Sequence, residues 1–98
     1  MLALGEFWRI SVIMPKIEIY TQPYCGFCAR AVRLLTEKGV AFTEISAPHG
    51  TKERETAISR SNGRTSVPQI FIDGAHIGGC DDLVALNRSG KLDPLLAA

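Results

Sequence analysis

The sequence predicts an α/β fold in which helices flank a four-stranded mixed sheet, in the order β-α-β-α-β-β-α. Two observations carry this prediction. Residues 16–20 alternate polar and apolar side chains, as a strand does, and the helically spaced residues 25–38 follow after a short loop. Later in the chain, residues 69–77 contain two strand-like runs separated by Asp-Gly, a pair typical of tight β-hairpins.

The first half of the chain supplies a strand–helix–strand unit. The apolar residues of segment 25–38 fall on one helix face, and Gly39 ends the helix. These residues are Cys28, Ala31, Val32 and Leu35. Residues 40–45 are expected to form a second short strand. Such a crossover is right-handed and makes its two strands parallel neighbours in one sheet.

The second half supplies a helix, a hairpin and a closing helix. Residues 51–61 are polar and helical, and Asn-Gly follows them. Residues 69–72 and 75–77 form the antiparallel hairpin. Residues 81–88 form the third helix, and residues 92–96 form at most a short tail helix. The sheet therefore combines one parallel pair with one hairpin, and helices cover both faces.

Length and composition indicate one small domain. The chain has 98 residues, 46% of them hydrophobic, and a formal net charge of +1. This charge does not favour nucleic acid or an anionic membrane as a partner, and no apolar run is long enough to cross a bilayer. Three cysteines, two of them close together, fit a reducing compartment better than a secreted disulfide scaffold. We therefore expect a cytoplasmic protein.

The N-terminal residues 1–13 are expected to be an extension outside the core fold, and residues 14–98 to form the domain. Met14 begins a segment that reads as a more natural start. The extension is apolar but has no basic region and no small-residue cleavage site, so a signal peptide is not favoured. The alternative is that Phe7, Trp8 and Ile10 pack onto the domain or onto a neighbouring chain.

The motif that carries chemistry is Cys25-Gly-Phe-Cys28, which lies at the start of the first predicted helix. The free N–H groups and the helix dipole favour a thiolate at this position, and the thiolate is the nucleophile in disulfide exchange. Cys28 falls further along, on the apolar face, and should be more buried with a higher thiol pKa. This asymmetry suits an attacking Cys25 and a resolving Cys28. Half of a zinc site is less favoured, because His49 and His76 are isolated.

A second motif, Thr-Ser-Val-Pro at residues 65–68, enters the hairpin. A cis peptide bond before Pro68 would leave the backbone of Val67 free to pair with an extended ligand. A trans proline that merely opens a strand is the alternative.

A third motif, Gly-Gly-Cys-Asp-Asp at residues 78–82, precedes the last main helix. The glycines allow close backbone approach, and the free N–H groups of the helix start would bind a carboxylate. Asp81 or Asp82 would either cap the helix or accept a hydrogen bond from an ammonium group of a ligand. Cys80 is expected to be a buried thiol without a redox role.

Together, the three motifs resemble those of a glutaredoxin of the dithiol class, in order and in spacing, and the resemblance spans residues 16–96. It implies a thioredoxin-like fold and an enzyme that uses glutathione as reductant. Cys25 would form the mixed disulfide with glutathione, and Cys28 would resolve mixed disulfides with proteins. No resident metal is expected.

The resemblance also implies how glutathione binds. Val67, before a cis Pro68, would pair with the cysteinyl part, and Cys80 and Asp81 would hold the γ-glutamyl end. Arg54 would meet the glycyl carboxylate, unless an added residue at Asn62 shifts this role to Glu55. The full expected glutathione-binding set is Gln22, Phe27, Arg54, Ser66, Val67, Pro68, Gly79, Cys80, Asp81 and Asp82.

Two departures from the family pattern bear on function. Gln22 stands where the family usually has a lysine, so the thiolate loses a nearby cation. The Cys-Gly-Phe stem is that of monothiol relatives, which share a [2Fe–2S] cluster between two subunits with two glutathiones as further ligands. An iron–sulfur carrier or sensor, with Cys25 as the protein ligand in a bridged homodimer, is therefore the alternative function. A zinc-binding module without thiol transfer is a third.

We therefore expect a monomeric oxidoreductase that reduces protein disulfides through both cysteines and glutathione mixed disulfides through Cys25 alone. Its expected partners are glutathione, disulfide-containing or glutathionylated proteins and, indirectly, glutathione reductase.

Overall fold

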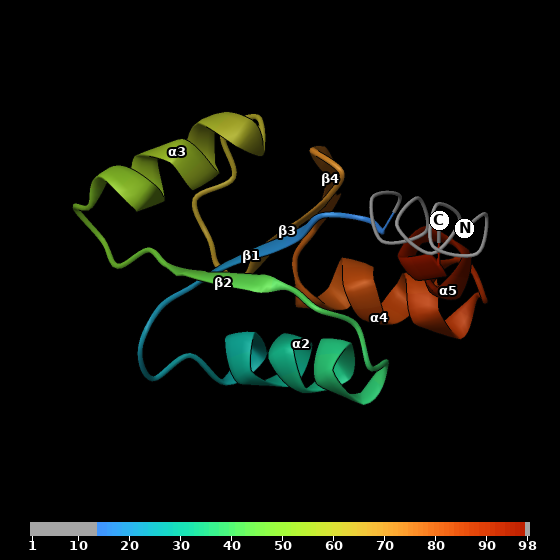
Figure 1. The fold of residues 1–98 in the computed structure, drawn as a ribbon. Helices are drawn as coiled ribbons and strands as arrows, with labels where there is room; N and C mark the ends of the chain where they lie inside the picture. Colours follow the sequence, from blue (N-terminus) through green and yellow to red (C-terminus); the bar gives the residue numbers. More distant parts are fainter. Residues whose placement is uncertain (1–13, 98) are drawn as a thin grey trace, which may run out of the picture.

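The computed structural model describes residues 14–97 and contains a four-stranded mixed sheet with helices on both faces (Figure 1). This confirms the predicted fold class. The elements, in chain order, are β1 (Ile17–Thr21), α2 (Gly26–Glu37), β2 (Thr43–Ser46), α3 (Lys52–Arg60), β3 (Gln69–Ile72), β4 (Ala75–Gly78), α4 (Cys80–Arg88) and α5 (Leu92–Ala97). The predicted extension, residues 1–13, lies outside the described residues, so its boundary and any packing of Phe7, Trp8 and Ile10 stay predictions.

The strands are ordered β2-β1-β3-β4. β1 is parallel to β2, as a βαβ crossover requires, and antiparallel to β3. β3 and β4 form the predicted hairpin. Its turn is Asp73-Gly74, and both residues have positive φ angles, 52° and 82°, which match the tight turn that an Asp-Gly pair favours.

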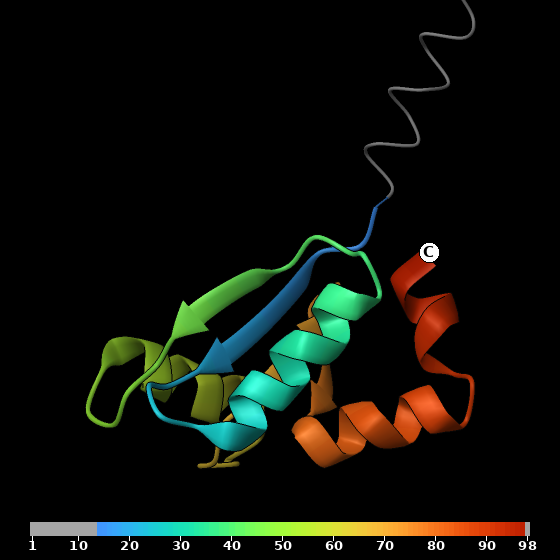
Figure 2. The ribbon, with the colours of Figure 1, turned by 90° about the horizontal axis from the view of Figure 1, so that it is seen from below.

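Alternating side chains of the central strands build a core on each face of the sheet. On one face, Ile17 and Ile19 of β1 and Ile70 and Ile72 of β3 pack with buried residues of α2, α4 and α5. On the other face, Tyr20, Ala47, Ala57 and Phe71 form a smaller cluster beneath α3. Figures 1 and 2 show α2 and α4 together on one side of the sheet and α3 on the other.

The element boundaries differ from the prediction by at most three residues, and those of β3 agree. β2 begins at Thr43 rather than at residue 40, because Thr43 is the first residue that pairs with β1, opposite Glu18. Val40 and Phe42 instead pack against the core between α2 and β2. α4 begins at Cys80, with Gly79 as its N-cap. Within residues 14–97, no helix is long and apolar enough to cross a membrane.

Candidate active site

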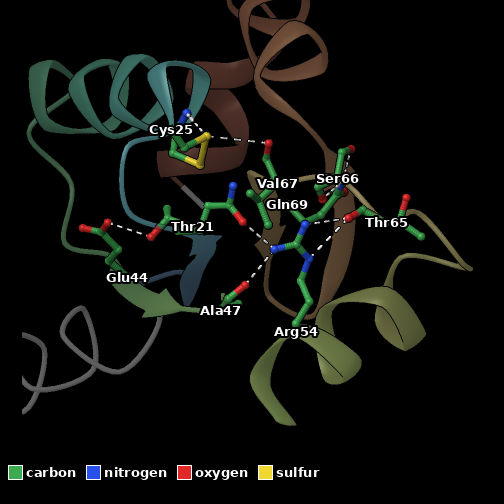
Figure 3. The surroundings of a disulfide bond; sticks show 11 residues. Thr21, Cys25, Glu44, Ala47, Arg54, Thr65, Ser66, Val67 and Gln69 are labelled. Carbon is green, nitrogen blue, oxygen red and sulfur yellow. Dashed lines mark hydrogen bonds between the residues drawn. A yellow bond between two sulfur atoms is a disulfide. The ribbon is translucent and has the colours of Figure 1, made fainter. Parts of the chain in front are cut away.

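The loop between β1 and α2 carries the two cysteines of the motif. Cys25 is the N-cap of α2, and the backbone N–H of Cys28 donates a hydrogen bond to Cys25 Sγ at 3.2 Å. The two side chains are joined in a disulfide, with Cα atoms 5.2 Å apart (Figure 3). Cys28 is buried and Cys25 is half-buried. The structure therefore has the predicted asymmetry in burial between the two thiols.

The start of α2 favours negative charge at Cys25. When the disulfide is reduced, the Cys28 N–H and the positive end of the helix dipole both stabilise a thiolate there. The first turn of α2 carries no acidic side chain that would oppose this effect. Helix geometry thus favours a thiolate at Cys25, although the side chain of Gln22 adds no positive charge.

The loop before β3 approaches the disulfide from the opposite side. The carbonyl oxygen of Val67 lies 3.9 Å from Cys25 Sγ (Figure 3), and the Val67–Pro68 peptide bond is cis. Behind the loop, the buried Gln69 donates to the Ser66 carbonyl oxygen at 3.0 Å and contacts His76 Nε2 through Oε1 at 2.7 Å. The side chain of Gln69 therefore fixes the loop backbone, and the Val67 carbonyl group faces Cys25.

Arg54 lies on α3, the second predicted helix, and is buried. Its side chain is only 5% exposed, and it donates to Gln22 Oε1 at 2.7 Å, to the Ala47 carbonyl at 2.9 Å and to the Thr65 carbonyl at 2.8 Å (Figure 3). The guanidinium therefore ties three loops around the disulfide instead of presenting its charge to solvent. A contact of Arg54 with the glycyl carboxylate of glutathione stays a prediction. The alternative, Glu55, is exposed, but its negative charge does not suit a carboxylate ligand.

A groove of about 230 Å³ lies beside the cysteine motif. Seven of the predicted glutathione-binding residues line it, namely Phe27, Ser66, Val67, Pro68, Cys80, Asp81 and Asp82. Gln22, Cys25 and Cys28 line a neighbouring hollow together with Tyr24 and Glu44. Gly79 lies behind the groove, where a Cβ would come within 3.3 Å of the Pro68 carbonyl oxygen. The structure thus brings the three sequence motifs together around one disulfide.

Sequence reasoning missed Arg64, which also lines the groove. Arg64 Nη1 forms an ion pair with Asp82 Oδ2 at 3.1 Å, and the same oxygen accepts from the Gly79 N–H at 2.9 Å. Asp82 therefore caps α4, the first of the two roles weighed for it. The available signal for Arg64 was its position directly before the Thr-Ser-Val-Pro motif.

Asp82 also makes a testable contribution to stability. The Gly79 N–H, and after it Arg64, lower the pKa of Asp82 from its ordinary value near 3.8. A carboxyl group with a lowered pKa stabilises the fold above its unfolded pKa, and this contribution is lost as pH falls through the folded pKa. We expect Asp82→Ala to lower the free energy of unfolding by about 1 kcal/mol at neutral pH, mostly through the lost hydrogen bond.

Urea unfolding at several pH values measures this effect. The gap between wild type and Asp82→Ala should shrink as pH falls below about 3.8, because Asp82 becomes protonated. Asp81→Ala is the matched control, since it removes a charge from the same helical turn without removing the Gly79 bond. A gap that stays constant in acid, or that Asp81→Ala reproduces, would contradict the assigned role.

Cys80 is buried and makes no disulfide. Burial raises the pKa of the Cys80 thiol, which keeps it protonated and unreactive near neutral pH. Its placement fits the expectation of a thiol without a redox role.

The fold and the site together define a thiol–disulfide oxidoreductase with a thioredoxin-like fold. The glutaredoxin family model matches residues 17–77. Glutaredoxin 3 of Escherichia coli K12 is 57% identical over 83 residues, which cover 85% of this chain and 99% of that protein. The chain therefore belongs to the glutaredoxin family.

Solved structures agree with this assignment. The solution structure of a glutaredoxin from Brucella melitensis has a TM-score of 0.75 and 50% identity, and the match covers 86% of this chain and 90% of that one. A crystal structure of a buckwheat glutaredoxin–glutathione complex has a TM-score of 0.74 and 31% identity, covering 97% of this chain and 87% of that one.

Proposed function

We propose that this enzyme uses glutathione to reduce protein disulfides and protein–glutathione mixed disulfides. The observation that carries the proposal is the position of Cys25, at the N-cap of α2 and beside a groove lined by the Val67 loop and the start of α4. A family member in complex with glutathione, the buckwheat protein, supports glutathione as the ligand of that groove.

In deglutathionylation, the Cys25 thiolate attacks the glutathionyl sulfur of a mixed disulfide. The client thiolate leaves, takes up a proton, and Cys25 carries glutathione as a mixed disulfide. A second glutathione thiolate attacks this bond, which releases oxidised glutathione and regenerates the Cys25 thiolate. This cycle needs no second protein thiol.

In the reduction of a protein disulfide, Cys25 attacks one client sulfur and releases the other as a thiol. Cys28 then attacks Cys25 Sγ, frees the second client thiol and leaves the Cys25–Cys28 disulfide. Two glutathiones return the enzyme to its dithiol form and are converted to oxidised glutathione. The contact between the Cys28 N–H and Cys25 Sγ supports the short path that this step needs.

The groove offers complementary groups for the parts of glutathione. In our proposal the Val67 backbone pairs with the cysteinyl part, and the N–H groups of Cys80 and Asp81 at the start of α4 receive the γ-glutamyl carboxylate. The exposed Asp81 carboxylate accepts from the γ-glutamyl ammonium group. Phe27, Ser66, Pro68, Gly79 and Asp82 shape the groove, and Arg54 acts indirectly by holding Gln22 and Thr65.

The test is reduction of a small glutathione mixed disulfide, coupled to glutathione reductase and NADPH, with and without glutathione. The proposal predicts turnover that requires glutathione. Turnover of a protein disulfide driven by another reductant, with none driven by glutathione, would contradict it.

We propose a monomer that works in a reducing compartment such as the cytoplasm, because the Cys25–Cys28 disulfide must be continually reduced.

Replacing Asp81 tests the glutathione site. We expect Asp81→Asn to raise the KM for glutathione roughly fivefold with little change in kcat, because one charge-assisted hydrogen bond is weakened. Steady-state kinetics at varied glutathione concentration measure the effect. Glu53→Gln removes a charge from the exposed face of α3 and is the control. An unchanged KM in Asp81→Asn would remove Asp81 from the site.

A glutathione-ligated [2Fe–2S] cluster remains the second candidate function. The observation that favours it is the open space at Gly26, where a Cβ would meet no atom within 4 Å, so the loop beside Cys25 is uncrowded. Within residues 14–97 no three metal-binding side chains gather, so glutathione and a second chain would have to complete the ligands. Anaerobic reconstitution with iron, sulfide and glutathione tests this, with visible absorbance and a dimeric mass as the expected result.

A further inference from the structure

The arginines in the described part of the chain fall into two groups. In the first group, the guanidinium is hydrogen-bonded or ion-paired within the chain, and the members are Arg54, Arg60 and Arg64. The second group consists of Arg30, Arg33 and Arg88, none of which forms an ion pair with residues 14–97. The guanidinium groups of these three arginines are therefore available to bind a carboxylate of another molecule.

All three of these arginines line one groove. It lies between α2 and α4, which are neighbours on the same face of the sheet and diverge toward their C-terminal ends (Figure 2), and its volume is about 280 Å³. Leu34 and Val84 give the groove an apolar component, and Glu37 is the one carboxylate in its lining. Three positive charges and one negative charge leave a local excess of +2, in a chain whose total formal charge is +1. We call this feature the arginine groove.

The arginine groove and the cysteine motif share one helix, since Cys25 is the N-cap of α2 and Arg30 and Arg33 lie further along it. Arg30 lies five residues after Cys25. At a rise of about 1.5 Å per residue, this separation corresponds to about 7–8 Å along the axis of α2. In the inference drawn below, the chain that flanks a disulfide engaged at Cys25 continues along α2 to Arg30 and Arg33. In our proposal a small glutathione mixed disulfide lies in the other groove, beside the Val67 loop, and the two grooves share no lining residue.

The chemistry of the lining selects the kind of partner. Guanidinium groups bind carboxylates through paired hydrogen bonds, and apolar side chains accommodate the aliphatic parts of a peptide. The near-neutral total charge of the chain does not favour a nucleic acid, whose binding needs many basic contacts. An acidic segment of a protein fits both the charge excess and the apolar component.

We propose that the arginine groove binds an acidic segment of client proteins while their disulfide or glutathionyl group is attacked by Cys25. The inference rests on the proposed function, which makes proteins the substrates, and it adds a preference among them. Charge pairs of this exposed kind contribute to encounter and selectivity, and salt screens them.

The test uses two synthetic peptides with the same intramolecular disulfide, one with a glutamate-rich flank and one with a glutamine-rich flank. For wild type at low salt, kcat/KM should be roughly threefold to tenfold higher for the glutamate peptide. The double variant Arg33→Gln/Arg88→Gln should lose this preference and still reduce a small glutathione mixed disulfide at the wild-type rate. The control Lys16→Gln/Lys52→Gln removes two positive charges elsewhere and should keep the preference.

Binding of a labelled, cysteine-free glutamate-rich peptide, followed by fluorescence anisotropy, tests the groove without any disulfide chemistry. Absence of turnover with all disulfides would refute the proposed function, whereas the binding measurement would still report on the groove. The inference is overturned if wild type treats both peptides alike, or if the double variant keeps the preference. It is equally overturned if the variant Lys16→Gln/Lys52→Gln loses the preference. In the anisotropy assay, it is overturned if an oligonucleotide displaces the labelled peptide at a lower concentration than an unlabelled acidic peptide does.

Discussion

We expect Cys25→Ser to abolish turnover of all disulfide substrates, and Cys28→Ser to abolish only the reduction of protein disulfides. A serine hydroxyl does not ionise near neutral pH, so the loss in Cys25→Ser is at least about a thousandfold. Cys28→Ser retains the nucleophile at the N-cap of α2 and therefore keeps deglutathionylation. It lacks the buried thiol that would resolve the bond between Cys25 and a client protein.

Parallel assays of the three proteins on a small glutathione mixed disulfide and on a protein disulfide measure this division of roles. Cys80→Ser serves as the matched control, because it removes the remaining cysteine of the chain, which lies buried and outside the disulfide. It should retain both activities. Equal loss of both activities in Cys25→Ser and Cys28→Ser would contradict the division, and loss in Cys80→Ser would show that the third thiol takes part.

Arg54→Leu should lower the free energy of unfolding by roughly 3 kcal/mol. The substitution leaves the carbonyls of Ala47 and Thr65 without their donor in a part of the molecule where Arg54 is only 5% exposed. Activity should fall as well, because Gln22 and the loop before Pro68 lose the group that ties them together. Arg54→Lys keeps the charge but not the forked geometry and should have an intermediate effect.

Urea unfolding and steady-state kinetics of the same proteins check this prediction. Lys52→Leu, on the exposed start of α3, is the control and should change stability by less than about 0.5 kcal/mol. If Arg54 also meets the glycyl carboxylate, Arg54→Leu will raise the KM for glutathione in addition to lowering stability. Stability close to that of wild type would contradict the structural role of the bonds to Ala47 and Thr65.

The features that depend on local sequence could be predicted without the structure. The alternation in β1, the apolar stripe of α2 and the Asp73-Gly74 turn each follow from the preferences of a few neighbouring residues. The burial of Cys28 relative to Cys25 follows in the same way, because helical spacing puts Cys28 on the stripe that faces the core.

The features that depend on long side chains could not be predicted in this way. Arg54 lies on α3, yet its partners are on three loops that only the folded sheet brings together. Arg64 likewise finds Asp82 across the groove, 18 positions along the chain. A flexible side chain with several donors has many candidate partners, and tertiary structure alone selects among them.

The pairing of β2 shows the same limit for the backbone. Residues 40–42 have the composition of a strand, but the register with β1 begins only at Thr43. Strand propensity reflects how well a side chain packs on a half-buried surface, and it does not require backbone pairing. Val40 and Phe42 pack against the core in this way, although their backbone does not pair with β1.

Intact-mass spectrometry of Cys28→Ser after incubation with oxidised glutathione tests the central proposal most directly. The Cys25 thiolate should attack the disulfide, release one glutathione thiolate and retain the other glutathionyl group. We predict one adduct per chain, mapped by peptide analysis to Cys25 and absent from Cys80. No adduct, or an adduct on Cys80, would contradict the assignment of Cys25 as the thiol that carries glutathione.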